Sequence, residues 1–372
     1  MSALRMAVIG GGHLGRIHAK LAHANEQFEL IAVADPCPNA RQLVETQLGV
    51  PTVADYHELI DRVDCAIVAA PTVAHYEVAS VLLRSGVHCL VEKPLAHTAD
   101  QAQRLVHIAK SHRRVLQTGH VERFNPTWTA VQPHLGVPKF IESVRAGAYS
   151  GRSTDIGVVM DLMIHDLDLI LSLDRSPVVE VSASGIALLG QHEDLAEARL
   201  GFESGLVATL RASRLATSPT RQMQVYTTNA YANIDFSSDS VSVVKPTAEV
   251  QSRLVALDDL QATERMQAKE RIFPDFLRAE SIKASSRNAI LDEQHDFAIS
   301  IQTSCSPAVT GEDGARAVEI AAKILDAVSQ HCWDGLGSKP WRIGAHALQE
   351  PRILTMPVRN GNERESRTRR AG

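Results

Sequence analysis

The stretch Met6-Ala-Val-Ile-Gly-Gly-Gly-His-Leu-Gly15 decides the fold class of this chain. Its first four residues are apolar and predict a short buried strand, and the residues after the glycines favour a helix. Gly10, Gly12 and Gly15 stand at the turn in the G-x-G-x-x-G spacing. In such a unit the first glycine allows a tight turn, the second lets backbone approach a pyrophosphate, and the third lets the helix pack closely on the strand. The helix N-terminus also offers free N–H groups to phosphates.

A second apolar strand distinguishes this stretch from a plain glycine turn. Glu29–Ala34 follows the predicted helix and ends at Asp35, twenty positions after Gly15. A carboxylate at this place accepts hydrogen bonds from the ribose hydroxyls of a dinucleotide and repels a 2′-phosphate. The sequence therefore predicts binding of NAD in preference to NADP. Arg41, the nearest residue that could accommodate a 2′-phosphate, lies six residues further on, inside the next predicted helix.

Length and composition limit the class of protein. A chain of 372 residues favours two domains, and 44% hydrophobic with 22% charged residues is typical of a globular protein. A net charge of −5 gives no general attraction to nucleic acid or anionic membranes. No apolar run reaches the length of a membrane span. The first strand begins too early for a signal peptide, and the five cysteines lack a C-x-x-C motif. We therefore expect a cytoplasmic protein with reduced thiols.

Up to about residue 123, predicted strands alternate with predicted helices. This order and the nearly continuous apolar strands predict a parallel sheet that is covered on both faces, as in a doubly wound Rossmann domain. Ligands of such sheets bind at the carboxyl ends of the strands. The predicted strand ends carry Gly10 to Gly15, Asp35, Ala70-Pro71-Thr72, Glu92-Lys93-Pro94 and Gln117-Thr-Gly-His120.

Beyond residue 124, predicted strands follow one another directly, which favours antiparallel pairing and an α+β domain. These strands are 139–148, 178–189, 197–202, 206–214, 222–227, 230–236 and 241–245. Helices are predicted at 158–173 and 314–330, while the charged segment 258–283 gives no clear pattern. The predicted division is a dinucleotide-binding domain (1–123), a substrate and oligomerisation domain (124–331) and a C-terminal extension (332–372). The end of the extension has no apolar pattern and is expected to be disordered.

Two groups of residues carry the expected chemistry. Lys93 follows a buried strand and precedes Pro94, so it is expected at the strand end, where it could stabilise a developing oxyanion. Asp161 and His165 are four residues apart on a predicted helix, so their side chains share one face. His165 could then act as a base that Asp161 orients. Each group also has a plain structural interpretation, as a surface Lys-Glu pair or as a satisfied histidine beside a carboxylate. No metal site is predicted.

The polar stretch Gly119-His-Val-Glu-Arg-Phe-Asn-Pro126 follows another strand. Arg123 and Asn125 could reach a ligand from it, although Asn125 could equally cap the helix that begins at Pro126. For a substrate with a diphosphate, Arg123, Arg145 and Arg152 are possible partners because arginine binds phosphate in a bidentate manner.

These motifs together resemble the glucose-fructose oxidoreductase / inositol dehydrogenase / rhizopine-catabolism (Gfo/Idh/MocA) superfamily. The resemblance rests on the glycine turn with His18-Ala19, on Pro71-Thr72-x-x-His75, on Glu92-Lys93-Pro94 and on Asp161-x-x-x-His165, and it runs from Met6 to about Ser329. It implies a Rossmann domain followed by an open-faced sheet domain. The catalytic residues that it implies are Lys93, Asp161 and His165. The cofactor-binding residues that we expect are Gly10, Gly12, His13, Leu14, Gly15, Asp35, Ala70, Pro71, Thr72, His75, Glu92 and Lys93.

Within this superfamily, residues 119–126 and 155–170 are similar to the branch that oxidises the 3-hydroxyl of UDP-N-acetylglucosamine for a partner aminotransferase. Met163 departs from the wider family, where glycine is usual at this position. The expected activity is therefore NAD-dependent oxidation of a secondary hydroxyl of a sugar nucleotide. The alternatives are a free sugar or inositol as substrate, or a catalytically silent nucleotide-binding protein.

An open-faced sheet needs a cover, so we expect a homo-oligomer, either a dimer or a tetramer. The apolar residues expected to face the partner are Met223, Val225, Tyr226, Tyr231 and Ile234.

Overall fold

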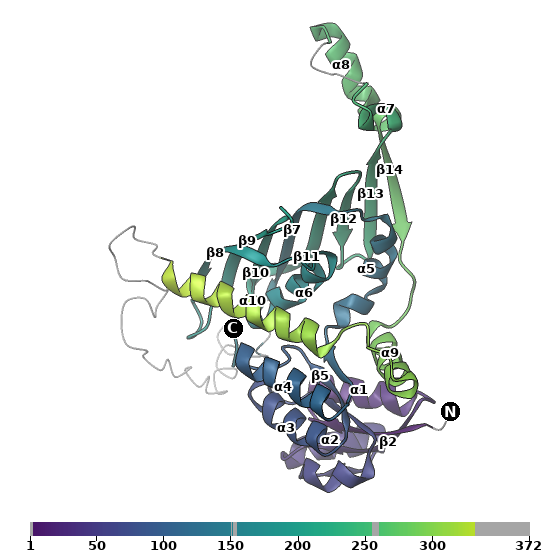
Figure 1. Cartoon of the computed structure of the whole chain (residues 1–372), viewed down its shortest axis with the longest axis vertical. Helices are drawn as coiled ribbons and strands as arrows, with labels where there is room; N and C mark the ends of the chain where they lie inside the picture. Colours follow the sequence, from purple (N-terminus) through teal and green to yellow (C-terminus); the bar gives the residue numbers. More distant parts are fainter. Residues whose placement is uncertain (1–2, 150, 152–154, 255–259, 332–372) are drawn as a thin grey trace, which may run out of the picture.

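The computed structural model describes residues 3–149, 151, 155–254 and 260–331. These residues form two sheets, each with its own set of helices, and the long helix α10 (Gly311–Gln330) lies between the two parts (Figure 1). The predicted extension 332–372 and the candidate Arg152 lie outside the described residues.

The first sheet confirms the predicted Rossmann domain. It has six strands in the order β3-β2-β1-β4-β5-β6, and all of its strand pairs are parallel. Its strands are β1 (Leu4–Ile9), β2 (Phe28–Ala34), β3 (Thr52–Val53), β4 (Cys65–Val68), β5 (His88–Glu92) and β6 (Leu116–Gly119). Its helices are α1 (His13–His23), α2 (Pro38–Leu48), the 3₁₀ helix η1 (Tyr56–Arg62), α3 (Thr72–Arg84) and α4 (Ala99–Ser111).

Burial on both faces explains the composition of these strands. The side chains of Met6, Ala7 and Val8 are fully buried, and so is the whole of β4. One face packs against α1 and α2, and the other packs against η1, α3 and α4. The chain order reverses between β1 and β4, so the carboxyl ends of these two strands flank a crevice that suits a ligand.

The second sheet has eight strands in the order β14-β13-β12-β11-β7-β10-β9-β8. They are β7 (Pro138–Ala148), β8 (Val178–Ile186), β9 (Leu195–Phe202), β10 (Val207–Ser213), β11 (Leu215–Thr227), β12 (Tyr231–Asp235), β13 (Ser240–Pro246) and β14 (Leu277–Lys283). Neighbouring strands pair antiparallel, as predicted, with one exception: β7 and β10 are parallel. The α+β class is thus confirmed, although the sheet is mixed.

Helices cover one face of this sheet. The helix α5 (Pro126–Val131) contacts β12, β13 and β14, while the π-helix η4 (Val159–Met163) and α6 (Ile164–Leu173) contact β7 and β10. The short 3₁₀ helices η2 (Val121–Phe124) and η3 (Gln132–His134) flank α5. Helix α10 packs on α6 and β8 and also on α4 of the first domain. The expected return of this late helix to the Rossmann domain is therefore only part of its role, since it is shared by both domains (Figure 1).

Two further parts of the structure, an arm and the helix α9, were not predicted. The ambiguous segment forms α8 (Ala262–Arg271), the π-helix η6 (Ile272–Phe276) and β14, and together with α7 (Ala248–Gln251) it extends the β13–β14 ribbon into an arm (Figure 1). Helix α9 (Ala289–Thr303) packs on α1. A signal for α9 was present, because Asn288 is a good N-cap residue and its side chain accepts from the N–H groups of Ile290 and Leu291.

Three of the five residues predicted to face a partner subunit do not lie on the open face of the sheet. Met223, Val225 and Ile234 are fully buried within one chain, on the helix-covered face. Tyr226 and Tyr231, which pair across β11 and β12, lie on the opposite face. Strand residues alternate between the two faces of a sheet, so a run of apolar residues cannot all point to one side. The open face therefore carries an aromatic cluster in which the rings of Tyr226 and Tyr231 lie 4.6 Å apart and Phe140 lies beside Tyr226.

We predict that Tyr226→Glu shifts the protein towards the monomer. The substitution places a negative charge in the aromatic cluster that we expect at a two-fold interface. The same charge on the symmetry-related subunit would lie nearby and repel it. Light scattering at micromolar concentration should show the wild type as an oligomer and the variant at a lower mass. Glu197→Gln, an exposed change on the same sheet, serves as the control. A wild-type monomer would contradict the prediction.

Candidate active site

The glycine turn has the geometry that its spacing predicts. Gly10 has φ of +110°, and a Cβ there would lie 2.5 Å from the carbonyl oxygen of Ala69. A Cβ on Gly15 would lie 1.8 Å from the carbonyl oxygen of Gly10, so only glycine lets α1 approach the strand. A Cβ on Gly12, the N-cap of α1, would meet no atom within 4 Å. The turn is therefore closed at the first and third glycines and open at the second, where a pyrophosphate would fit.

Asp35 lies at the carboxyl end of β2 and contacts this turn. Its Oδ2 accepts a hydrogen bond of 2.7 Å from the N–H of Gly11, and its Oδ1 accepts one of 2.8 Å from the N–H of Cys37. A carboxylate has about four lone-pair directions, so capacity remains for two ribose hydroxyls. Arg41 lies in α2, as expected, but its Nη1 turns back and donates to the carbonyl oxygens of Asp35 and Pro36.

The segment Ala70-Pro71-Thr72 leads from β4 into α3, and His75 connects it to the loop that carries Lys93 and Pro94. The Nε2 of His75 lies 2.9 Å from the carbonyl oxygen of Ala70, and its Nδ1 lies 2.8 Å from that of Pro94. Burial is the main cause that lowers the pKa of His75. The ring is almost fully buried and uses both nitrogens within the protein, so it positions the ends of β4 and β5.

Lys93 and Asp161, which are far apart in the sequence, meet between the two domains. The Nζ of Lys93 donates to Oδ1 of Asp161 at 2.9 Å and to its carbonyl oxygen at 2.7 Å. Both side chains are largely but not completely buried, with 15% and 25% of their surface exposed. Lys93 comes from the end of β5 and Asp161 from η4, so this ion pair joins the dinucleotide domain to the second domain. The structure thus brings together two of the three predicted catalytic residues.

His165 lies in the first turn of α6, after a π-helical segment at Val159–Met163. The predicted helix is present, but its first turn is wider than an α-helix, a feature often found at functional sites. The ring is half-buried, and its Nδ1 is buried without a hydrogen-bond partner in the described part of the chain. Burial, followed by the charges of Lys93 and Arg145, holds the pKa of His165 well below its usual value. The imidazole is therefore neutral at pH 7 and can accept a proton.

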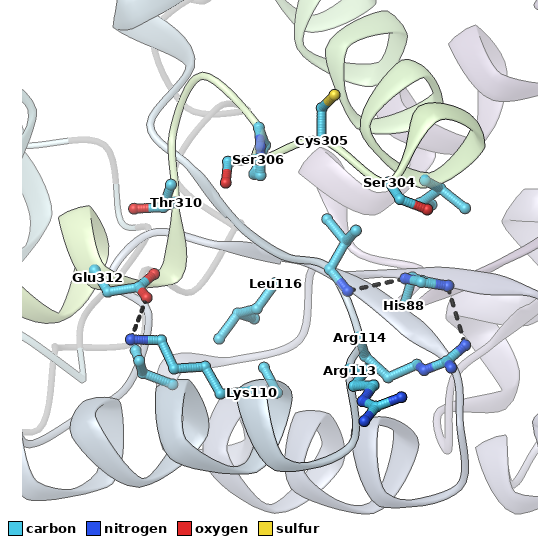
Figure 2. A pocket seen from close by; sticks show the side chains of 15 residues that line it. His88, Lys110, Arg113, Arg114, Leu116, Ser304, Cys305, Ser306, Thr310 and Glu312 are labelled. Atoms are coloured by element: carbon cyan, nitrogen blue, oxygen red, sulfur yellow. Dashed lines mark hydrogen bonds and ion pairs between the residues drawn. The ribbon is translucent and has the colours of Figure 1, made fainter.

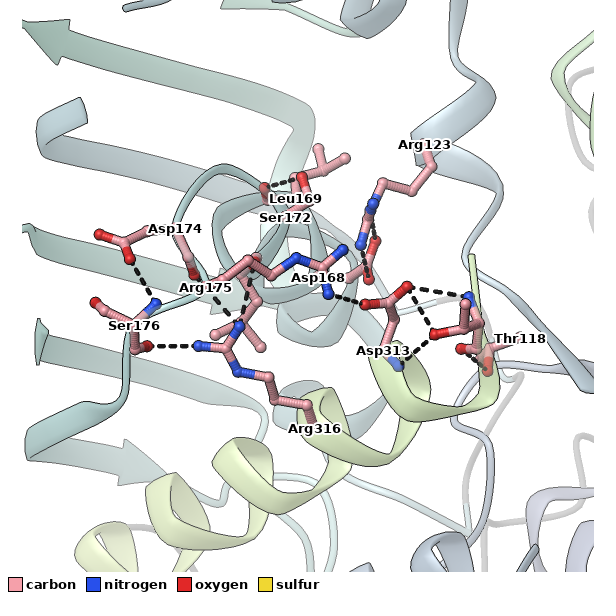
Figure 3. Close-up of polar contacts among 12 residues, drawn as sticks. Thr118, Arg123, Asp168, Leu169, Ser172, Asp174, Arg175, Ser176, Asp313 and Arg316 are labelled. Atoms are coloured by element: carbon pink, nitrogen blue, oxygen red, sulfur yellow. Dashed lines mark hydrogen bonds and ion pairs between the residues drawn. The ribbon is translucent and has the colours of Figure 1, made fainter. Parts of the chain in front are cut away.

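Two of the arginines proposed as phosphate partners, Arg123 and Arg145, form ion pairs inside the protein. Arg123 forms a bidentate pair with Asp168, with distances of 2.7 and 3.0 Å (Figure 3). Arg145 is buried and pairs with Glu122 and Asp166, so its interpretation as a phosphate ligand is wrong. The oxygen of Asn125 accepts from the N–H of Thr127, which confirms the helix-cap alternative.

Sequence reasoning missed a buried network behind Lys93. The Nε2 of His18 lies 2.7 Å from Oε1 of Glu92, and the amide of Gln294 donates to Nδ1 of the same ring. Glu293, from α9, lies beside them, and its two carboxyl oxygens have no hydrogen-bond partner among the described residues. Glu92 thus points into this buried network. The ligand atoms of His18, Glu92 and Glu293 all lie within 4.8 Å of one another, close enough to share one proton or one cation.

Of the two, a proton on Glu293 is the simpler way to compensate the charge of this buried cluster. Burial, and then the negative charge of Glu92, raise the pKa of Glu293 well above its usual value. The folded state therefore binds a proton that the unfolded chain releases at a lower pH. The contribution of Glu293 to folding stability is complete below its pKa in the unfolded chain. This contribution is lost as the pH rises from that value to the higher pKa in the folded protein.

We predict that Glu293→Gln removes this decrease of folding stability with pH, because glutamine has nearly the same shape and does not ionise. The unfolding free energy of the variant relative to the wild type should grow with pH by up to about 1.4 kcal/mol per pH unit. Denaturant unfolding between pH 5 and pH 9 measures this difference, with the exposed Glu26→Gln as control. A difference that stays constant with pH would show that Glu293 is ionised in the folded protein.

With the fold and the site in place, comparison with known proteins defines the class. Residues 4–120 match the model of an oxidoreductase family with an NAD-binding Rossmann fold, and residues 132–233 match the GFO/IDH/MocA C-terminal domain. The chain is therefore an oxidoreductase and belongs to the Gfo/Idh/MocA family. In the part of the chain that the structure describes, no helix is both long and apolar enough to cross a membrane.

Two individual relatives are similar to this chain over most of its length. UDP-N-acetylglucosamine 3-dehydrogenase of Acidithiobacillus ferrooxidans is 32% identical over 88% of this chain and 98% of its own length. A solved structure of that enzyme has a TM-score of 0.76 at 31% identity, covering 88% of this chain and 98% of its own. Myo-inositol 2-dehydrogenase of Thermotoga maritima is 25% identical over 85% of this chain and 93% of its own length.

Proposed function

We propose that this oxidoreductase removes hydrogen from a secondary hydroxyl of a UDP-sugar, with Lys93, Asp161 and His165 as the catalytic group. The observation that carries the proposal is the ion pair between Lys93 and Asp161, with the neutral His165 four residues further along the same helical segment. These groups lie next to the end of β5, on the same edge of the Rossmann sheet as the glycine turn and Asp35.

Each residue has a distinct part in this chemistry. His165 accepts the hydroxyl proton, for which its lowered pKa keeps a ring nitrogen free. The ammonium group of Lys93 stabilises the negative charge that develops on the substrate oxygen. Asp161 holds Lys93 in place, because the Nζ of Lys93 donates to both its carboxylate and its carbonyl oxygen. Bound NAD⁺ would supply the hydride acceptor.

The residues present fit a dinucleotide. The open space at Gly12 and the N-terminus of α1 would accommodate the pyrophosphate, and the free lone pairs of Asp35 would accept from the ribose hydroxyls. Asp35 also disfavours the 2′-phosphate of NADP, although Arg41 lies at the same strand end. We therefore propose NAD as the cofactor.

UDP-N-acetylglucosamine, oxidised at its 3-hydroxyl, is the substrate that we propose. The support is the similarity to a UDP-N-acetylglucosamine 3-dehydrogenase along nearly the whole length of both proteins. Free inositols are the second candidate, because inositol dehydrogenases are also among the relatives, at lower identity. The 3-keto product would be a substrate for an aminotransferase.

The substrate test follows NADH at 340 nm with NAD and either UDP-N-acetylglucosamine or a panel of inositols and free sugars. An amine that traps the keto product should be included, because oxidation of an alcohol by NAD is often unfavourable at equilibrium. Turnover of UDP-N-acetylglucosamine alone supports the proposal. Turnover of free inositols alone would overturn the substrate and keep the dehydrogenase, whereas NADH binding without any turnover would favour a catalytically silent protein.

We predict that Lys93→Ala and His165→Ala each lower the rate of turnover by about 10²- to 10⁴-fold, the usual range for loss of a general base or of an oxyanion partner. The affinity for NADH should change little, because neither side chain contacts the glycine turn or Asp35. The exposed substitutions Lys139→Ala and His107→Ala are the matched controls. A near-normal rate in either active-site variant would remove that residue from its proposed role.

We also predict that Asp35→Asn reduces the preference for NAD over NADP by roughly tenfold or more, since hydrogen bonds to a charged group contribute about 1.5–3 kcal/mol. Asparagine keeps one oxygen that can accept from the N–H of Gly11 in the glycine turn, whereas the N–H of Cys37 loses its acceptor. Dissociation constants for both cofactors, measured for the wild type, for this variant and for the exposed Asp61→Asn, test the prediction. A wild-type preference for NADP would refute the proposed cofactor.

A further inference from the structure

A cavity lies away from the proposed active site. It has a volume of about 500 Å³ and is formed by α4, by the turn that follows α4, and by the loop between α9 and α10 (Figure 2). His88 and Val115, at the amino ends of β5 and β6, line its inner wall. The glycine turn, Asp35 and Lys93 lie at the carboxyl ends of their strands, so the cavity opens at the opposite edge of the Rossmann sheet. Its volume is within the range of small-molecule sites.

The walls of this cavity carry an excess of positive charge. Lys110, Arg113 and Arg114 lie along one side (Figure 2). Glu312 is the one carboxylate in the lining, and it forms an ion pair of 2.7 Å with Lys110. Burial, and then the charge of Arg114, lower the pKa of His88 to about 4, so this ring adds no charge at neutral pH. After the Lys110–Glu312 pair, the charges of the two arginines remain uncompensated within the lining.

The two arginines differ in how they are held. Arg114 is fixed, because its side chain donates to the carbonyl oxygens of Gly86 and His112 and contacts Nε2 of His88. The guanidinium of Arg113 makes no hydrogen bond or ion pair with any described residue. Its backbone has φ of +54°, in the left-handed region that non-glycine residues seldom adopt. This conformation ends helix α4: the N–H of Arg113 donates to the carbonyl oxygen of Lys110, and the N–H of Arg114 donates to that of Ala109.

The remaining lining suits an organic ligand that carries an anion. Ser304, Ser306 and Thr310 place hydroxyl-bearing side chains opposite or beside the arginines (Figure 2). Val106, Leu116 and Ile301 give the cavity apolar surface. Arginine in particular matches phosphate, because its planar fork donates two parallel hydrogen bonds.

We propose that this cavity binds a small phosphorylated molecule, with the phosphate at Arg113 and Arg114 and the rest of the ligand against Leu116 and Ile301. The site is separate from the proposed dinucleotide and substrate sites. It is also connected to them through β6: Thr118 donates its N–H to Val309 and its hydroxyl to the carbonyl oxygen of Thr310, and β6 ends at Gly119 beside Glu92. A ligand that orders the 304–310 loop therefore acts on a strand that reaches the proposed active site.

The test uses the full-length protein and pyrophosphate as the probe. Calorimetric titration is performed with saturating NADH, which occupies the dinucleotide site. Comparison with a cavity variant then separates binding in the cavity from binding of pyrophosphate at the diphosphate part of the proposed UDP-sugar site. Arg113→Gly is the main variant, because it removes the guanidinium and glycine suits the left-handed backbone, so folding should be preserved. Arg104→Gln, an exposed arginine of α4 that lies outside the cavity lining, is the matched control.

We expect pyrophosphate to bind the wild type and the Arg104→Gln variant equally, and Arg113→Gly to weaken binding by about tenfold or more, as expected when a bidentate phosphate contact is lost. Hydrogen exchange should slow in residues 110–118 and 304–312 of the wild type on binding. Absence of binding, equal binding by Arg113→Gly, or citrate binding as tightly as pyrophosphate would each overturn the proposal.

Discussion

The contact between Lys93 and Asp161 is the constraint on which the arrangement of the proposed site depends. It spans the boundary between the Rossmann sheet and the second domain, and it is mostly shielded from water. Removing charges from water costs free energy unless they are paired and hydrogen-bonded. Lys93 meets this condition with two acceptors from one residue, the carboxylate and the carbonyl of Asp161. The pair therefore fixes the position of η4, and with it His165, relative to the end of β5.

Further buried ion pairs support this part of the second domain. Arg145, on β7, binds Glu122 and Asp166, while Arg123 binds Asp168. Both aspartates lie on α6, directly after His165, so the helix is held from two sides. Figure 3 shows how α10 continues the network, with Asp313 contacting Arg175 and with Arg316 donating to the carbonyl of Ser176. Because breaking one partner of a buried pair leaves an uncompensated charge, these contacts restrict α6 to one position.

The Rossmann side of the site has its own buried polar support, in which the amide of Gln294 and the carboxyl of Glu293 meet His18 and Glu92. Helix α9 supplies the first two residues and lies nearly 200 residues beyond Glu92 in the chain. This connection links the helix that follows the glycine turn to the residue that precedes Lys93. Binding of a dinucleotide at α1 and the position of the proposed catalytic lysine therefore depend on one shared cluster.

The sequence by itself determined those features that local chemistry dictates. The glycine spacing, the buried strand before it and Asp35 after it predicted the Rossmann turn, because only glycine fits at Gly10 and Gly15. Alternation of strands and helices predicted the parallel sheet, and consecutive strands predicted the α+β domain. Short motifs resembled those of the Gfo/Idh/MocA family, and comparison with the models of both domains confirmed this family.

Only the tertiary structure decided which long-range partners each polar side chain has. Arg123, Arg145 and Asn125 have the chemistry of ligand-binding residues, yet their partners inside the protein are Asp168, Asp166 and Thr127. Likewise, the face to which Met223 points follows from the register of β11 with its neighbours, and the raised pKa of Glu293 follows from its burial beside Glu92. Register and burial are set by contacts between segments far apart in the chain, and local sequence patterns do not contain them.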